Sequence, residues 1–154
     1  MEINVTIDPD FADEVDAVRL EEIARRTLLL EDSGEAVELG LVVTGQEQIQ
    51  ALNREYRGKD RPTDVIAFYM TAGEADDFVV PPDGLRHLGE VVISYPQAII
   101  QAVDEGHAIM REVTILVIHG VLHLLGYDDE TPELKQRMSA REQAILADIE
   151  GDTA

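Results

Sequence analysis

The sequence predicts an α/β (α+β) fold, in which a mixed sheet of about four strands is packed with about five helices. Segments with strand-like and helix-like patterns alternate along the chain. The length of 154 residues suits one domain with a single core, so we expect one domain spanning residues 1–154. A strongly apolar segment at residues 107–125 predicts a central helix that is buried on several sides.

The first half of the chain predicts three strands and two helices. Alternation of apolar and polar residues indicates the strands, and apolar residues at helical spacing indicate the first helix. The expected strands are residues 3–7, 35–44 and 63–68, and the expected helices are residues 13–30 and 47–56. The third strand is rich in β-branched and aromatic residues, and Pro62 stands at its entry.

The second half predicts one strand and three helices after a loop. Residues 71–87 contain paired acids, adjacent prolines and glycines, which indicates an exposed loop. The expected strand is residues 89–94, and the expected helices are residues 97–106, 107–125 and 131–150. Pro96 suits a first helical turn, Gly106 suits a helix end, and Thr131 suits an N-cap.

Composition narrows the chemistry that the protein can perform. The chain has no cysteine, which excludes disulfides, thiolate metal sites and cysteine nucleophiles. A tightly held transition metal would therefore use imidazole and carboxylate ligands. The N-terminal residues lack the basic and apolar regions of a signal peptide, and no apolar stretch reaches the ~18 residues of a membrane span. We expect a soluble cytoplasmic protein without a membrane partner.

The charge is strongly acidic but unevenly distributed. A formal net charge of -20 repels a polyanion on average, which argues against nucleic acid as a partner. However, four of the twelve basic residues fall between positions 54 and 61, namely Arg54, Arg57, Lys59 and Arg61. A solvated loop is the ordinary explanation of such a run, so a second signal is needed before it indicates a binding site.

A metal site is indicated by the sequence HGVLHLLGYDD, residues 119–129, at the end of the central helix. His119 and His123 are four residues apart, so their rings project from one helical face. Gly126 can adopt a positive φ and end the helix, which lets the chain turn and bring Asp129 toward the pair. A catalytic zinc is typically held by three protein ligands, such as two imidazoles and a carboxylate, and keeps a fourth position open.

The other candidate ligands fit the pattern less well. Asp128 is a rival third ligand, but its position one residue nearer the helix suits a cap of the turn. His87 falls in the predicted loop and His107 at a predicted helix start, and we expect both to be ordinary polar residues.

The histidine spacing also invites comparison with the metzincin peptidases, which carry H-E-x-x-H-x-x-G-x-x-H. Those enzymes have a glutamate base beside the first histidine, whereas this chain has Gly120, which cannot accept a proton. A cationic run beside a metal centre favours a phosphodiester substrate, because arginine neutralises phosphoryl oxygens. We therefore expect Arg57 to bind phosphate, and a metallopeptidase is the alternative.

Three blocks of the sequence resemble the YbeY family of bacterial metal-dependent endoribonucleases. They are LNREYRGKDRPTDVIAF at residues 52–68, LGEVVISYPQA at residues 88–98 and the histidine block, which is the most specific. The resemblance implies one zinc ion per chain and hydrolysis of single-stranded RNA in the cytoplasm. It also implies a role in ribosomal RNA maturation and ribosome quality control, with ribosomal RNA and ribosome-associated proteins as partners.

By this resemblance, the metal ligands are His119, His123 and the residue at position 129, and Arg57 is the arginine of the Y-R-G-K-D block. The family's third ligand is usually histidine, whereas this chain has Asp129, an oxygen donor that zinc accepts. An ionised aspartate lowers the charge of the site by one unit. The metal then becomes a weaker Lewis acid, and harder ions such as manganese are favoured.

The resulting hypothesis is a zinc-dependent endoribonuclease in which Arg57 positions the scissile phosphate, with lesser contributions from Arg54, Lys59 and Arg61. Either a water activated by the metal or the ribose 2′-hydroxyl attacks the phosphate, and both routes stay open. No general base lies beside the first histidine. A non-catalytic assembly factor, in which zinc braces the fold, is a further alternative.

Overall fold

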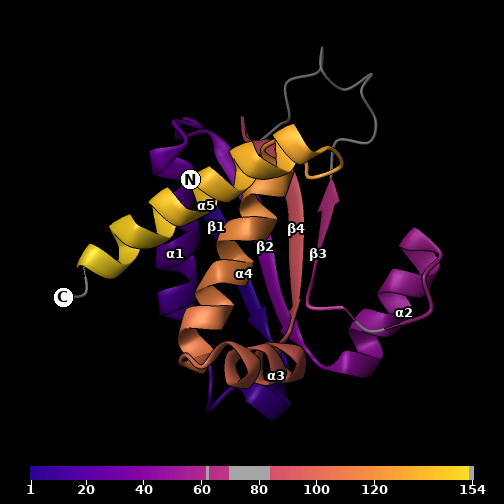
Figure 1. Ribbon diagram of the computed structural model, residues 1–154. Helices are drawn as coiled ribbons and strands as arrows, with labels where there is room; N and C mark the ends of the chain where they lie inside the picture. The colour runs from indigo at the N-terminus through magenta and orange to yellow at the C-terminus, as the bar shows by residue number, and fades with distance from the viewer. Residues whose placement is uncertain (62, 70–83, 153–154) are drawn as a thin grey trace.

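The computed structural model describes residues 1–61, 63–69 and 84–152, and these residues form a sheet packed with helices (Figure 1). The strands are β1 (Glu2–Ile7), β2 (Val37–Thr44), β3 (Val65–Tyr69) and β4 (Arg86–Ser94). The helices are α1 (Ala17–Leu30), α2 (Gln46–Arg57), α3 (Tyr95–Glu105), α4 (Ile109–Leu124) and α5 (Pro132–Asp152), with a short 3-10 turn, η1 (Pro9–Phe11).

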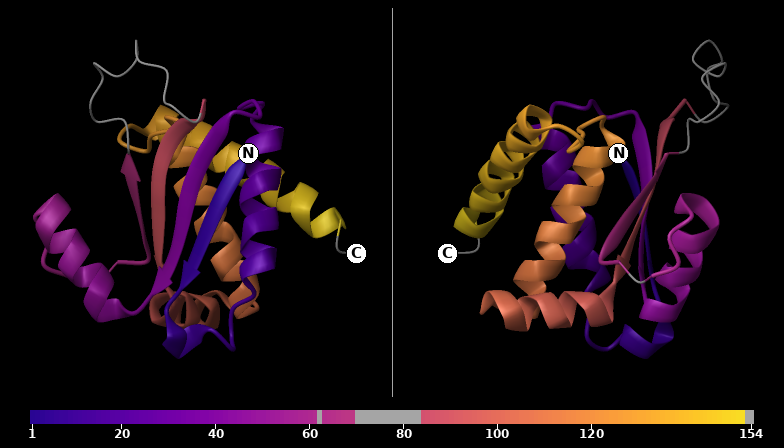
Figure 2. Two further views of the ribbon diagram at one scale, coloured as in Figure 1. Left: turned by 180° about the vertical axis from the view of Figure 1, so that it is seen from behind. Right: turned by 45° about the vertical axis from the view of Figure 1, so that its right-hand side comes forward.

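The sheet is mixed, with strand order β1-β2-β4-β3. β1, β2 and β4 are parallel, and β3 pairs antiparallel with β4 at one edge. Helices α1 and α4 cover one face, α5 lies outside them, and α2 lies on the other face (Figure 2). The predicted fold class, a mixed four-stranded sheet packed with helices, is confirmed.

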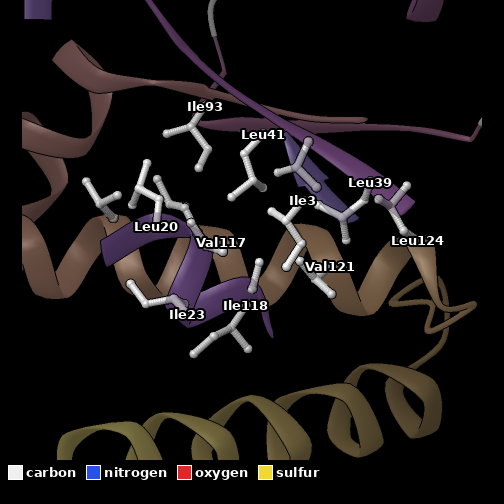
Figure 3. Packing of buried hydrophobic residues seen from close by; sticks show 14 of the residues in the cluster. Ile3, Leu20, Ile23, Leu39, Leu41, Ile93, Val117, Ile118, Val121 and Leu124 are labelled. Carbon is white, nitrogen blue, oxygen red and sulfur yellow. The ribbon is translucent and has the colours of Figure 1, made fainter. Parts of the chain in front are cut away.

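The core lies between α4 and the sheet. Alternate residues of β2 and β4 point toward this helix, among them Leu41 and Ile93, and they meet Val117 and Val121 of α4 (Figure 3). The helix also packs against α1 and α5, which explains why its apolar residues surround it on nearly all sides. A helix buried in this way is a rigid support for the polar residues near its end.

Gly120 permits the closest approach between α4 and the sheet. A Cβ atom at this position would lie 2.4 Å from Cγ1 of Val91 on β4, a distance that real Cβ atoms essentially never show. The glutamate that metzincin peptidases place beside their first histidine therefore has no room here. This steric reason adds to the chemical one against a peptidase.

Several predicted boundaries were wrong by a few residues. The first helix begins at Ala17 instead of residue 13, because the Asp16 side chain caps the Val18 N–H at 3.0 Å. The long helix begins at Ile109 instead of residue 107, because the His107 N–H donates to Ala102 O and closes α3.

The ends of β4, β2 and α5 follow from strand pairing and helix capping. β4 begins at Arg86 instead of residue 89, because its first residue already pairs with Val37 of β2, and β2 begins at Val37 instead of residue 35. Thr131 caps α5 as predicted, accepting the Leu134 N–H at 3.1 Å. Pro62 and most of the predicted loop, residues 71–83, lie outside the described residues.

Within the described ranges, no single helix is long and apolar enough to cross a membrane. Helices α3 and α4 reach that length and composition only when taken together, and the chain bends by 115° between them.

Replacement of Gly120 by alanine should lower the free energy of unfolding by about 1–3 kcal/mol, because the added methyl group overlaps the stiff Val91 side chain. Urea unfolding of the variant and the parent measures the effect. The matched control is Gly151→Ala near the end of α5, where a Cβ meets nothing within 4 Å and no loss is expected. Equal stability of Gly120→Ala and the parent would contradict the close packing.

Candidate metal centre and substrate cavity

The two histidines near the end of α4 direct one ring nitrogen each toward the same point. His119 Nε2 and His123 Nε2 are 3.1 Å apart. On the far side of each ring, Nδ1 meets an oxygen acceptor: Glu142 Oε1 at 2.5 Å for His119 and the backbone oxygen of Tyr127 at 3.0 Å for His123. These acceptors assign the ring proton to Nδ1, so each neutral ring presents an Nε2 lone pair.

Two lone pairs at this distance repel each other unless a cation lies between them. Burial lowers the pKa of His119, but the hydrogen bond and charge of Glu142 outweigh it, with help from Asp64 and Asp129, and raise the pKa above its ordinary value. Burial and the neighbouring His119 lower the pKa of His123. The pair is therefore arranged to gather positive charge, as a proton on His119 or as a metal ion.

The chain that leaves α4 brings Asp129 to the same place. Gly126 has a φ of 105°, and Asp128 Oδ1 accepts the backbone N–H groups of Asp129 and Glu130 at 2.7 and 3.1 Å. Asp128 thus caps the turn, and Asp129 Oδ2 lies 3.9 Å from His123 Nε2.

The three donor groups fit a divalent ion. One ligand atom from each of His119, His123 and Asp129 lies within 4.8 Å of the others. A tetrahedral zinc with metal–ligand distances of about 2.0–2.2 Å holds its ligand atoms about 3.4 Å apart, so the observed separations require only small side-chain adjustments. Two imidazoles and one carboxylate leave a fourth position for water or substrate.

Glu142 is a site residue that the sequence analysis missed. It lies on α5, 23 residues after His119, and reaches the ring only because α5 docks beside α4. A carboxylate behind a ligating histidine fixes the tautomer and raises the basicity of the ligand. No local sequence pattern marks a glutamate in the middle of an amphipathic helix for this role.

A cavity of about 460 Å³ lies beside the histidine pair. Its walls come from β3 and the residues before it, from α4, from the turn after α4 and from the end of α2. Arg57 lines the cavity, and its binding of phosphate stays a prediction. The described residues that line the cavity do not include Arg54, Lys59 or Arg61. Arg54 instead pairs with Asp60 at 3.4 Å.

Two further cavity residues are Asp64, which directly precedes β3, and Tyr69, the last residue of β3; neither was expected as a site residue from the sequence. Asp64 Oδ1 accepts the Val65 N–H at 2.7 Å, and the charge of Asp64 acts on His119. Tyr69 is 52% exposed, and burial, followed by the charges of Asp128 and Asp129, raises the pKa of its phenol.

The cavity is acidic. Asp64, Asp128, Asp129 and Glu130 line it, against Arg57 as the only arginine or lysine among the described lining residues. Such a surface attracts cations and repels a phosphate group. A bound divalent ion would reduce this repulsion before a phosphodiester could enter.

The remaining two histidines each lie against a carboxylate, and His87 belongs to β4 instead of the predicted loop. His87 Nδ1 lies 2.7 Å from Glu38 Oε1 of β2. His107 Nε2 lies 2.7 Å from Glu112 Oε1, near the opposite end of α4.

Comparison with known protein families yields one match over most of the chain. The model of the family described as Endoribonuclease YbeY matches residues 7–150. Relatives that carry the name Endoribonuclease YbeY include one from a Dehalococcoides mccartyi strain, which is 52% identical and aligns over 97% of this chain and 90% of its own length. One from Geobacillus thermodenitrificans is 40% identical over 92% of this chain and 96% of its own length.

Among solved structures, the solution structure of a Thermotoga maritima protein resembles this fold with a TM-score of 0.62. The similarity covers 97% of this chain and 90% of the other, at 22% sequence identity. It supports the arrangement of strands and helices.

The Glu142→Gln variant should bind a divalent ion about 10–100-fold more weakly than the parent, because glutamine keeps the size of the side chain but loses the charge that polarises His119. Titration with Zn²⁺ against a competing chelator measures the affinity. The matched control is Glu133→Gln in the exposed first turn of α5, which should bind like the parent. Equal affinity of Glu142→Gln and the parent would show that this carboxylate does not support the ligand.

Proposed function

The chain belongs to the YbeY family of endoribonucleases, and on that premise we propose that it hydrolyses phosphodiester bonds in single-stranded RNA, using a zinc ion held by His119, His123 and Asp129. Ribosomal RNA is the proposed substrate, in maturation and quality control of the ribosome. The main support for the metal site is that His119 Nε2 and His123 Nε2 lie 3.1 Å apart, while the Nδ1 atom of each ring already has an oxygen acceptor.

The chain's own residues prepare the site for this chemistry. Glu142 and the Tyr127 carbonyl hold the two rings so that both Nε2 atoms face the same point. Asp129 adds an oxygen donor on a turn that Asp128 stabilises. When bound, the ion would polarise a phosphoryl oxygen or lower the pKa of a water molecule. The aspartate oxygen donor also suits manganese in place of zinc.

Arg57 is the proposed phosphate-binding residue. It stands at the last position of α2, where Gly58 with a φ of 70° ends the helix, and its side chain lines the cavity. Its guanidinium can contact two phosphoryl oxygens and offset charge that develops on them. Arg54, Lys59 and Arg61 would touch RNA outside the cavity and contribute less.

The two alternatives fit the site less well. A peptidase of the metzincin kind needs a base at position 120, where the side chain is absent and has no room. A zinc that only braces a fold is normally enclosed by four protein ligands. Three donors beside a cavity of about 460 Å³ favour catalysis over a structural ion.

The Arg57→Ala variant should cleave single-stranded RNA about 100-fold more slowly than the parent with unchanged metal content, because a charged donor to the phosphate is lost. Cleavage of a labelled oligoribonucleotide and elemental analysis give the two readouts. Arg54→Ala is the matched control, since Arg54 pairs with Asp60, and it should lose little activity. Cleavage by Arg57→Ala at the parent rate would remove this role.

We expect the parent to hold about one zinc ion per chain. The Asp129→Ala variant should lose most of this zinc, because one of three ligands is removed. Elemental analysis of protein purified without a metal-affinity column measures this content. The matched control, Asp128→Ala, removes the turn cap but no donor, and it should retain more metal. Full zinc content in Asp129→Ala, or greater loss in Asp128→Ala, would exclude Asp129 as the third ligand.

A further inference from the structure

Two adjacent residues of α5 reach the two histidines by separate routes. Glu142 contacts His119 directly at 2.5 Å. Arg141 points to Glu31, the residue that caps the end of α1, and its Nε donates to Glu31 Oε2 at 2.8 Å and its Nη2 to the same oxygen at 2.5 Å.

The other carboxylate oxygen of Glu31 accepts the hydroxyl of Tyr127 at 2.5 Å. The Glu31 side chain is only 8% exposed, so its charge depends on these partners instead of on water. Arg141, Glu31 and Tyr127 thus form one connected polar group between α1, α5 and the turn after α4.

Tyr127 connects this group to the metal centre through its backbone. Its carbonyl oxygen accepts the Nδ1–H of His123 at 3.0 Å, and its N–H donates to Leu122 O at 3.0 Å. Asp129 follows two residues later. A shift of the Tyr127 ring would therefore move both the acceptor of one ligand and the start of the segment that carries another.

We propose that Arg141 is a positioning residue for the metal centre, acting through Glu31 and Tyr127 to hold His123 in its Nδ1–H tautomer and to place the turn that bears Asp129. This inference rests on the proposed function of the same site. It makes the contact of Arg141 on α5 with Glu31 at the end of α1 a condition for full metal affinity.

The chain provides a matched control for a general effect of helix docking. Arg26 of α1 and Asp148 of α5 join the same two helices through an ion pair, in which Arg26 Nε donates to Asp148 Oδ1 at 2.8 Å. Arg26 and Arg141 have similar side-chain exposures, 39% and 38%. Asp148 stands seven residues, or about two helical turns, after Arg141 on α5.

The experiment compares Arg141→Met, Tyr127→Phe and Arg26→Met with the parent by two readouts. Nitrogen-15 NMR of the metal-free protein reports the tautomer of the His123 ring. Titration with Co²⁺ reports affinity and, through the visible spectrum, the geometry of the ligands. Arg141→Met and Tyr127→Phe should show mixed His123 tautomers, an altered cobalt spectrum and about 10-fold weaker binding. Arg26→Met should match the parent, and Arg141→Lys should recover part of the loss.

Parent-like tautomer and cobalt affinity in Arg141→Met and Tyr127→Phe would overturn the positioning role. Equal losses in Arg26→Met would overturn it too, because they would reflect helix docking in general. If Arg141→Met does not fold, Tyr127→Phe, which removes one hydroxyl group, decides the question. Absence of RNA cleavage in a parent that binds cobalt normally would overturn the proposed function. The NMR and titration results would still decide the positioning role of Arg141.

Discussion

The site depends on the hydrogen-bonding needs of two imidazole rings on an otherwise buried, apolar helix. Each ring needs an acceptor for one nitrogen, because an unpaired buried polar group is costly. The protein supplies these acceptors from outside α4, as the Glu142 carboxylate and the Tyr127 carbonyl. With both Nδ1 atoms occupied, the two Nε2 atoms must face each other at 3.1 Å, and a cation resolves their repulsion.

The supports of the site come from three helices, the consecutive helices α4 and α5 and the distant helix α1. α4 lies rigidly against β4 because Gly120 allows contact without a side chain. α5 contributes Glu142 and Arg141, and α1 contributes Glu31 at its end. The histidine pair is therefore positioned by the packing of helices, and the turn that bears Asp129 is tied to the same packing through Tyr127.

Charge explains how an acidic protein can act on a polyanion. The net charge of -20 and the carboxylates around the cavity oppose entry of RNA when no cation is bound. The same carboxylates favour a divalent ion, and Arg57 adds a positive charge on the cavity wall. A bound divalent ion would favour substrate binding in such a site, because it offsets two of the negative charges of these carboxylates.

The sequence by itself determined the fold class, the strands and helices within a few residues, and the grouping of His119, His123 and Asp129, since these follow from periodicity, capping and one helical turn. It indicated Arg57 as the phosphate-binding residue of the basic run, but it could not find the supporting residues Glu142 and Arg141. Only the tertiary structure shows that Arg57 lines the cavity, that Glu142 contacts His119 and that Arg141 contacts Glu31. Those placements depend on how α2 and α5 dock, and docking is set by contacts between residues far apart in the chain, for which local spacing carries no signal.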